Sequence, residues 1–342
     1  MRKLFVVSII IALAAAGAGI AGWTFWHKVS TPVAGYAPTK FFTVDEGASA
    51  GAVADALQQQ GIIASATDFR IFVRLDGSGS RFVAGTYDLS PSQPIRDIVH
   101  VLTSGLVSQE QQITILEGWT TQEIAEYLKK KGVVTSQEFI LAAETADTRK
   151  LIPDKNYDFL ADKPATAGLE GYLFPDTYRL YKNTRADQIV EKMLDTFGKK
   201  FTQEMRSEVK AEGLTVYQAV TLASIVEKEV RTAEDRHIAA GIFLERLKQG
   251  MPLQSDATVN YVTGKQALQP TNDDVATDSP YNTYKVKGLP PGPIDNPSLA
   301  SLEAVANPTK SAYLYFLTKP DGSTVFSTTY EEHLANKQKY LK

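Results

Sequence analysis

The chain lacks several features that would point to common classes of protein. Its 342 residues include no cysteine, which fits a compartment where free thiols would be oxidised. Its 36 basic residues do not outnumber its 39 acidic residues, so nucleic acid is not an expected partner. The four histidines are scattered at His27, His100, His237 and His333 and give no metal-site spacing. The sequence also has no glycine-rich phosphate loop and no Gly-x-Ser-x-Gly elbow, so we expect neither a metal nor another cofactor.

A long uncharged run is present near the N-terminus. Residues 4–26 carry no charged side chain over 23 positions, and about 20 apolar residues are enough to span a bilayer. Arg2 and Lys3 precede this run and favour the cytoplasmic side. We therefore expect a cytoplasmic tail at residues 1–3, a transmembrane helix at residues 4–26 and the rest of the chain outside the cytoplasm. A cleaved signal peptide is the alternative, because residues 14–21 are rich in small side chains.

A repeated pattern follows a short extended stalk at residues 27–40. Residues 42–47 (Phe-Thr-Val-Asp-Glu-Gly) are echoed by residues 113–118 (Ile-Thr-Ile-Leu-Glu-Gly). In each copy the pattern predicts a strand and then a helix, and the helices expected at residues 50–60 and 121–131 would end at Gly61 and Gly132. These small α+β modules either space and rigidify the chain or bind a glycan or a partner.

The most informative segment is residues 215–230, which the spacing of apolar side chains predicts to be a helix. Thr215 and Gln218 fit a capping box at its start. Glu227 falls inside the apolar stripe, whereas Glu229 falls outside it. A buried carboxyl without a partner has a raised pKa and can keep a proton near neutral pH, as a general acid must. The alternative is that Glu227 pairs with an Arg or a Lys and has a structural role.

Two further segments carry side chains suited to a ligand. Residues 170–178 combine three aromatic side chains with two carboxylates, and residues 278–297 form a turn-rich run that contains two tyrosines and Asn282. A tyrosine offers an apolar face and a polar tip, which suits stacking against sugar rings. The second segment could therefore wall a groove, or it is an ordered surface loop. Asp256 lies at the start of an expected helix, where a carboxylate also serves as a cap.

Several motifs occur in order along nearly the whole chain. They lie at residues 115–120 (ILEGWT), 170–178 (EGYLFPDTY), 222–229 (LASIVEKE), 253–256 (LQSD), 281–284 (YNTY), 288–294 (GLPPGPI), 307–308 (NP) and 313–316 (YLYF). This set resembles the YceG-like family of endolytic murein transglycosylases. The chain departs from the family pattern at Ala257, where a proline is expected, and at Val230, where a threonine is expected.

The resemblance implies that the chain cleaves the glycan strands of peptidoglycan internally, by a lyase step that leaves a 1,6-anhydro muramyl end. The catalytic carboxyl of the family matches Glu227, which the helical pattern also selects. Glu227 would protonate the glycosidic oxygen and then accept the proton of the sugar's C6 hydroxyl, with water excluded. Glu229 is the second choice for the acid. The residues expected to bind the substrate are Gln254, Asp256, Tyr281, Asn282, Tyr284, Glu170 and Tyr172.

These observations predict an α+β fold in which a LysM-like region at residues 41–150 precedes a YceG-like catalytic domain at residues 151–342. The resemblance and the topology together imply a single-pass inner-membrane protein whose catalytic domain lies in the periplasm. Its expected partners are peptidoglycan strands, the inner membrane and peptidoglycan synthases, and its expected role is to release or terminate new strands.

Two other functions stay open. One is a glycoside hydrolase in which Asp256 or Glu170 is a second carboxylate beside Glu227. The other is a non-enzymatic anchor that only holds glycan.

Overall fold

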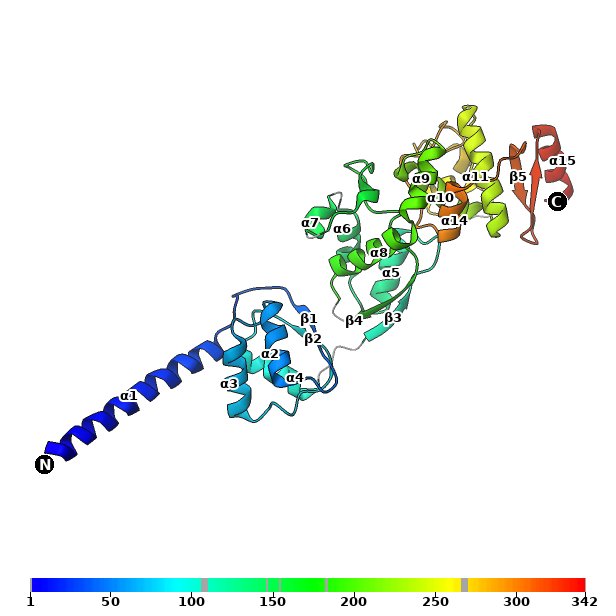
Figure 1. Ribbon diagram of the computed structural model, residues 1–342. Coiled ribbons are helices and arrows are strands. Elements are labelled where there is room, and N and C mark those ends of the chain that lie inside the picture. The colour runs from blue at the N-terminus through cyan, green and yellow to red at the C-terminus, as the bar shows by residue number, and fades with distance from the viewer. Residues whose placement is uncertain are drawn as a thin grey trace. The chain divides into compact units, whose positions relative to one another are not determined.

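The computed structural model describes residues 2–105, 110–145, 147–153, 155–181, 184–265 and 270–341, with side chains from residue 15 onward (Figure 1). The chain divides into two compact units, residues 1–110 and residues 111–342. Each unit has its own core of buried apolar side chains. Helices and two-stranded sheets make up both units, so the expected α+β fold class is confirmed.

The first unit packs helices against a pair of strands. Strands β1 (Lys40–Val44) and β2 (Gly85–Leu89) are antiparallel, with Phe42 opposite Tyr87. The helices of this core are α2 (Ala50–Gln59), α3 (Ala66–Asp76) and α4 (Ile95–Ser104). Each helix buries one apolar face, and Leu57, Phe69 and Ile98 from these faces share the core with the two strands.

Helix α1 (Arg2–Ser30) covers residues 4–26, the segment expected to span a membrane. Within the part of the chain whose side chains are described, no helix is both long enough and apolar enough to cross a membrane. The side chains of residues 1–14, which include about half of the expected span, lie outside that part.

The second unit is mainly helical. Its elements in chain order are β3 (Glu110–Thr114), α5 (Thr121–Lys130), α6 (Ser136–Ala143), α7 (Thr148–Leu151), the short 3₁₀ helix η1 (Asp158–Leu160), β4 (Thr177–Tyr181), α8 (Ala186–Lys200), α9 (Gln203–Ala211), α10 (Val216–Glu229), α11 (Ala233–Lys248), α12 (Asp256–Thr263), α13 (Asn272–Val275), α14 (Leu299–Ala306), β5 (Tyr315–Thr318), β6 (Thr324–Ser327) and α15 (Tyr330–Tyr340). Strand β3 pairs with β4, and β5 pairs with β6 in antiparallel register.

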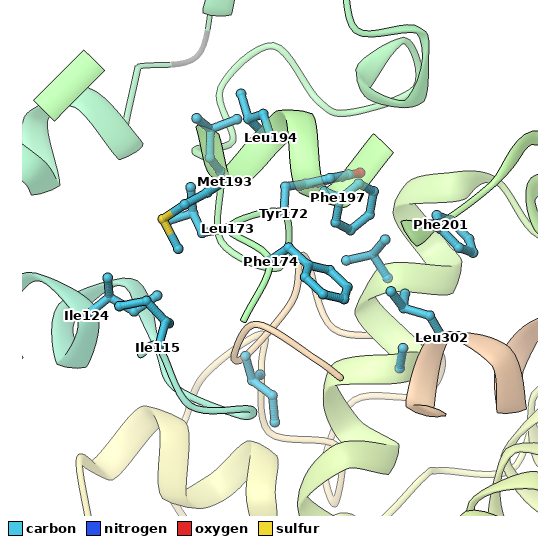
Figure 2. Packing of buried hydrophobic residues seen from close by; sticks show 14 of the residues in the cluster. Ile115, Ile124, Tyr172, Leu173, Phe174, Met193, Leu194, Phe197, Phe201 and Leu302 are labelled. Carbon is cyan, nitrogen blue, oxygen red and sulfur yellow. The ribbon is translucent and has the colours of Figure 1, made fainter. Parts of the chain in front are cut away.

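The second copy of the repeat belongs to the second unit. The two compact units meet between residues 110 and 111. Strand β3 of this copy takes β4 as its partner, although β4 follows much later in the chain. Ile115 and Ile124 lie in the same core as Tyr172 and Phe197 (Figure 2). The repeat itself predicts local structure only, so it could not reveal that this copy is completed by a distant strand.

Helix α10 lies at the centre of the second unit. The expected capping box is present, because Gln218 N donates to Thr215 Oγ1 at 3.2 Å and Thr215 N donates to Gln218 Oε1 at 2.9 Å. Helices α9, α11, α12 and α14 all contact α10. Thr221 and Ser224 are buried as well as the apolar positions, so the buried surface of α10 is wider than the predicted stripe.

The side-chain amide of buried Asn296 joins segments that are far apart in the chain. Its Oδ1 accepts the N–H groups of Gly171 and Leu173, both at 2.9 Å. Its Nδ2 donates to Trp119 O at 3.0 Å and to Glu170 Oε1 at 2.8 Å. The amide thus fills its hydrogen-bonding capacity and fixes the loop before α14 against the loop before α5 and the segment before β4.

Two partly buried carboxyls also tie elements together. Both oxygens of Glu170 accept the N–H of Thr121, at 3.0 Å each, at the start of α5. Glu229 at the end of α10 accepts a 2.5 Å hydrogen bond from Ser255 Oγ, directly before α12. Burial raises the pKa of Glu170 to about 7 and the pKa of Glu229 to about 7, although hydrogen bonds from Thr121 and Ser255 oppose these rises.

Because the pKa values of Glu170 and Glu229 are raised, we expect the free energy of unfolding of the second unit to fall as the pH rises from about 4.5 to about 7. Over that range the folded state holds protons on Glu170 and Glu229 that the unfolded state has released, so folding is favoured at the lower pH. Each unit of pKa shift corresponds to about 1.4 kcal/mol. Urea unfolding at a series of pH values measures the slope. Glu229→Gln should reduce it, and an unchanged slope in that variant would contradict the assignment.

A second prediction concerns Gly241 in α11, where a Cβ would lie only 2.2 Å from the backbone oxygen of Thr309. Gly241→Ala should lower the free energy of unfolding by roughly 1–3 kcal/mol, because backbone must move to admit the methyl group. Gly51→Ala in α2 is the matched control, since the nearest atom there is 3.7 Å away. The control should be neutral or stabilising by up to about 1 kcal/mol. Equal thermal shifts in the two variants would argue against the close contact at Gly241.

Candidate active site

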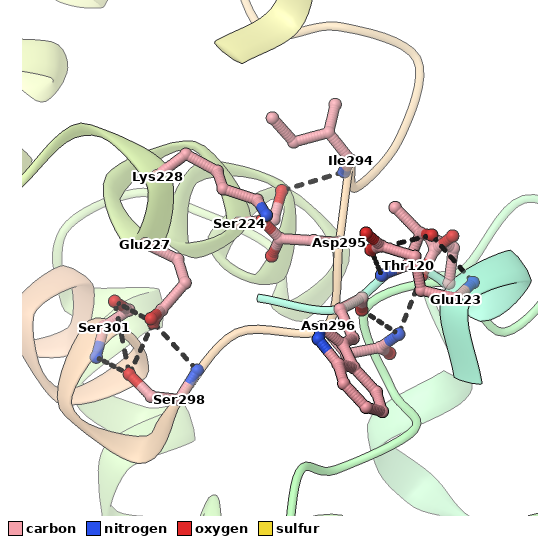
Figure 3. A network of polar contacts seen from close by, with 12 residues as sticks. Thr120, Glu123, Ser224, Glu227, Lys228, Ile294, Asp295, Asn296, Ser298 and Ser301 are labelled. Carbon is pink, nitrogen blue, oxygen red and sulfur yellow. Dashed lines mark hydrogen bonds and ion pairs between the residues drawn. The ribbon is translucent and has the colours of Figure 1, made fainter. Parts of the chain in front are cut away.

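Glu227 lies near the end of α10 with only 6% of its side chain exposed. Its Oε2 accepts hydrogen bonds from Ser298 N at 3.0 Å, Ser298 Oγ at 2.5 Å and Ser301 Oγ at 2.7 Å (Figure 3). Its Oε1 accepts a 3.1 Å hydrogen bond from Arg236 Nη2, which comes from α11. Ser298 is the N-cap of α14, so the carboxyl also lies at the positive end of a helix dipole.

This geometry corrects one part of the sequence interpretation. Glu227 is buried as predicted, but it is not without a partner, because it forms an ion pair with the largely buried Arg236. That contact is the one expected under the structural alternative. The four donors all stabilise the ionised carboxylate. The surroundings of Glu227 are therefore suited to the negative charge that remains after it has given up a proton.

The loop that follows β3 lies over Glu227. At Gly118, which has a φ of +71°, a Cβ would be 3.4 Å from Glu227 Cγ and 3.4 Å from Lys228 Nζ. The preceding residue, Glu117, is exposed. Partial desolvation of its carboxyl and then the nearby Glu227 raise the pKa of Glu117, whereas Arg236 lowers it. The sequence analysis did not select Glu117, although it belongs to the repeated Glu-Gly pair and to the ILEGWT motif.

Asp295 is a second carboxyl that the sequence analysis missed. It is 0% exposed, and neither of its oxygens has a hydrogen-bond partner among the described residues. Lys228 Nζ lies 3.9 Å from its Oδ2 (Figure 3). Burial holds the pKa of Asp295 well above its usual range, and Lys228 offsets only part of this effect. No periodicity marks Asp295, because it lies in a proline-rich loop whose burial depends on the tertiary fold.

The other predicted acid, Glu229, belongs to a different cluster. It bonds to Ser255, and the neighbouring Asp256 accepts a 2.6 Å hydrogen bond from Tyr284 Oη. Exposed Gln254 has a φ of +52°, a left-handed conformation that is uncommon outside glycine, and its N–H donates to Thr283 O at 3.1 Å. Such strain persists where the surroundings impose it and is frequent at functional sites. Gln254, Asp256 and Tyr284 therefore lie together, and their role in binding the substrate stays a prediction.

Three of the expected substrate residues have structural contacts instead. Tyr172 is buried among aromatic rings and has no exposed surface, which contradicts a direct contact with substrate. Buried Asn282 donates to Val275 O and Thr277 O at 2.8 and 2.7 Å and so fixes the turn that contains it. Glu170 binds the first turn of α5, as described above. Aromatic and amide side chains in a motif do not reveal from the sequence which of them face solvent.

Tyr281 is partly exposed, and its ring centroid lies 5.1 Å from that of Tyr261 on α12. Tyr281 thus keeps the half-buried, half-accessible placement that a sugar-binding tyrosine needs. Within the described ranges, no three His, Cys, Asp or Glu side chains are grouped in a way that could hold a metal ion.

Two known proteins named endolytic murein transglycosylase are similar to this chain over most of its length. A protein from Bacillus subtilis (strain 168) named endolytic murein transglycosylase is 37% identical over 303 residues, which cover 87% of this chain and 84% of that protein. A protein of the same name from Streptococcus pneumoniae serotype 2 (strain D39) is 32% identical over 358 residues, covering 98% of this chain and 64% of that protein.

A solved structure of a related protein has a similar fold. The crystal structure of a yceG-like protein from Listeria monocytogenes superposes with a TM-score of 0.59 at 32% identity, and the match covers 87% of this chain and 99% of that one. The model of the YceG-like family matches residues 42–339. The chain therefore belongs to the YceG-like family.

Proposed function

We propose that this chain is an endolytic murein transglycosylase, a lyase that cuts peptidoglycan glycan strands internally and leaves 1,6-anhydro muramyl ends. The observation that carries the proposal is the placement of Glu227. It stands in the LASIVEKE motif as a largely buried carboxyl, held by Arg236, Ser298 and Ser301. The names of the relatives from Bacillus subtilis and Streptococcus pneumoniae support the same activity. In the cell the reaction would release or terminate newly made strands.

In the proposed mechanism one carboxyl performs both proton transfers. Protonated Glu227 first gives its proton to the glycosidic oxygen as the bond to C1 breaks. The carboxylate that results is stabilised by the donors from Ser298, Ser301 and Arg236. It then removes the proton of the C6 hydroxyl, whose oxygen closes the 1,6-anhydro ring on C1. The proton returns to Glu227, so the cycle needs neither water nor a second carboxylate.

The contacts of Glu170 and Asp256 argue against the hydrolase alternative in which either of them is the second carboxylate. A hydrolase would need a second carboxylate across the scissile bond from Glu227. Glu170 is engaged by Thr121 and Asn296, and Asp256 is engaged by Tyr284. The carboxyls in electrostatic contact with Glu227 are instead Glu117 and Asp295, and Asp295 is too deeply buried to activate water.

We also propose that α1 anchors the chain in the inner membrane, with its N-terminus in the cytoplasm and the rest of the chain in the periplasm. The support is the sequence of residues 1–26, where two basic residues precede an uncharged run. An anchored enzyme would act near the synthases that extrude new glycan. The LysM-like region proposed for residues 41–150 would hold glycan or act as a spacer.

Glu227→Gln tests the central role of this carboxyl. The variant keeps the shape of the side chain but cannot cycle a proton, so cleavage should fall at least about 100-fold while glycan binding is retained. Mass spectrometry of uncrosslinked glycan after digestion measures the products. The wild type should give anhydro ends, and reducing ends would instead indicate a hydrolase.

Glu229→Gln is the matched control for this experiment, because it makes the same chemical change two residues away in the same helix. It should retain most of the activity. If Glu227→Gln cuts as fast as the wild type, or if no protein form cuts glycan, then the assignment of Glu227 as the acid is refuted.

Ser301→Ala tests the stabilisation of the carboxylate. It removes the 2.7 Å hydrogen bond to Glu227 Oε2, and loss of one donor from a reacting oxyanion typically lowers kcat by about 100-fold or more. Ser207→Ala removes the hydroxyl of an exposed serine on α9, which bonds only to Gln203 O of its own helix, and should leave kcat unchanged. Steady-state rates on glycan compare the two. An equal effect of both substitutions would rule out a specific role for the Ser301 hydroxyl.

A further inference from the structure

Three tyrosines gather at the end of α10 that is opposite to Glu227. Tyr217 lies in the first turn of α10, Tyr261 lies on α12, and Tyr281 lies in the turn-rich run that precedes α14. The rings of Tyr261 and Tyr281 are in contact, with centroids 5.1 Å apart. The hydroxyls of Tyr217 and Tyr281 both point to Gly292, where a Cβ would lie 2.4 Å from the first and 3.3 Å from the second. Glycine at this position therefore makes room for the two hydroxyls.

The segment of residues 291–298 runs beside α10 from these tyrosines to Glu227. Tyr217 Oη donates to Pro291 O at 3.0 Å, and Ser224 Oγ accepts the N–H of Ile294 at 3.0 Å. Ser298 N then donates to Glu227 at 3.0 Å. The contacts follow the same order along α10 and along the segment, so the helix and the segment run side by side. Ten residues of helix separate Tyr217 from Glu227, which corresponds to about 15 Å.

Tyr217 and Tyr281 pack against the core on one side, and all three tyrosines keep part of their surface accessible to a ligand. Tyr261 is 38% exposed, and Tyr217 and Tyr281 are partly exposed. Their rings offer apolar faces next to hydroxyl groups, a combination that suits the apolar face and the hydroxyl rim of a sugar ring. Residues 292–298 are themselves buried and mark only the direction from the tyrosines to Glu227. A strand bound at Glu227 that extends about 15 Å in that direction would meet this cluster.

We propose that Tyr217, Tyr261 and Tyr281 form a distal glycan site, which binds a sugar ring several units along the strand from the bond that is cut. The inference rests on the proposed function, because its ligand is the strand that Glu227 cleaves. Only a strand long enough to reach from Glu227 to Tyr261 gains the binding free energy of this site. The distal site therefore favours cleavage within long strands over cleavage of short fragments.

The test compares Tyr261→Ala and Tyr261→Phe in the full chain on two substrates, long uncrosslinked glycan strands and a short glycan oligosaccharide that cannot reach both ends. Tyr261→Ala should raise KM for the long strands by about two- to tenfold, the usual effect of one aromatic contact, with kcat unchanged. Its KM for the short oligosaccharide should equal that of the wild type. Tyr261→Phe keeps the ring and should stay close to the wild type on both substrates.

Tyr313→Ala is the matched control. Tyr313 is 37% exposed and contacts Phe326 with ring centroids 5.5 Å apart, so it resembles Tyr261 in exposure and in ring contact but lies outside the proposed site. It should not alter KM for either substrate. Thermal unfolding of each variant shows whether it is folded. If Tyr261→Ala is not, Tyr261→Leu takes its place, because it keeps an apolar side chain but loses the ring, and the same rise in KM on long strands alone is expected.

Equal changes of KM on long and short substrates, or no change on long strands, would overturn the distal site while leaving the lyase activity intact. The reverse case is also distinguishable. If the wild type forms no anhydro ends, the proposed function fails, and binding of intact long glycan to Glu227→Gln with and without Tyr261→Ala still decides on the site. Weaker binding in the double variant supports it, and equal binding refutes it.

Discussion

The amide of Asn296 is the interaction on which the rest of the site depends. It bonds to Gly171, Leu173, Trp119 and Glu170, so it holds together segments that are more than 120 residues apart in the chain. Without it, two buried N–H groups would be left unpaired, and each costs roughly 1–3 kcal/mol. The loop that Asn296 fixes continues directly to Ser298, the donor to Glu227. The position of the proposed acid is thus set by a residue that does not touch it.

The contacts of Glu227 change how its chemistry should be understood. A carboxyl in an apolar pocket resists losing its proton, whereas Glu227 lies among donors that support the charge left behind. These donors fix the carboxyl in place between α11 and the start of α14. Glu117 and Asp295 are two further carboxyls close enough to Glu227 for it to raise the pKa of each.

The sequence alone predicted those features that depend on residues close together in the chain. The capping box of α10, the glycines after the repeat helices and the burial of Glu227 follow from spacing alone, and the structure has all three. Contacts between distant residues were not predictable in this way. Arg236 reaches Glu227 from the next helix, and β3 pairs with a strand beyond residue 176. The apolar stripe underestimated the buried surface of α10, because other helices contact this helix on several sides. Tyr172 and Asn282 are buried by the tertiary packing, which their local sequence does not reveal.

The two copies of the repeat show how one short sequence can acquire two different uses. In the first copy, Glu46 and Gly47 are exposed and the space around Gly47 is open, so that turn is free to vary. In the second copy, the equivalent Glu117 and Gly118 close over Glu227 and Lys228, and the strand before them is completed from elsewhere in the chain. Strand β1 of the first copy also takes its partner, β2, from outside the repeat, but the space around Gly47 is open. The second copy shares a core with α10, so a change there reaches the helix that carries Glu227.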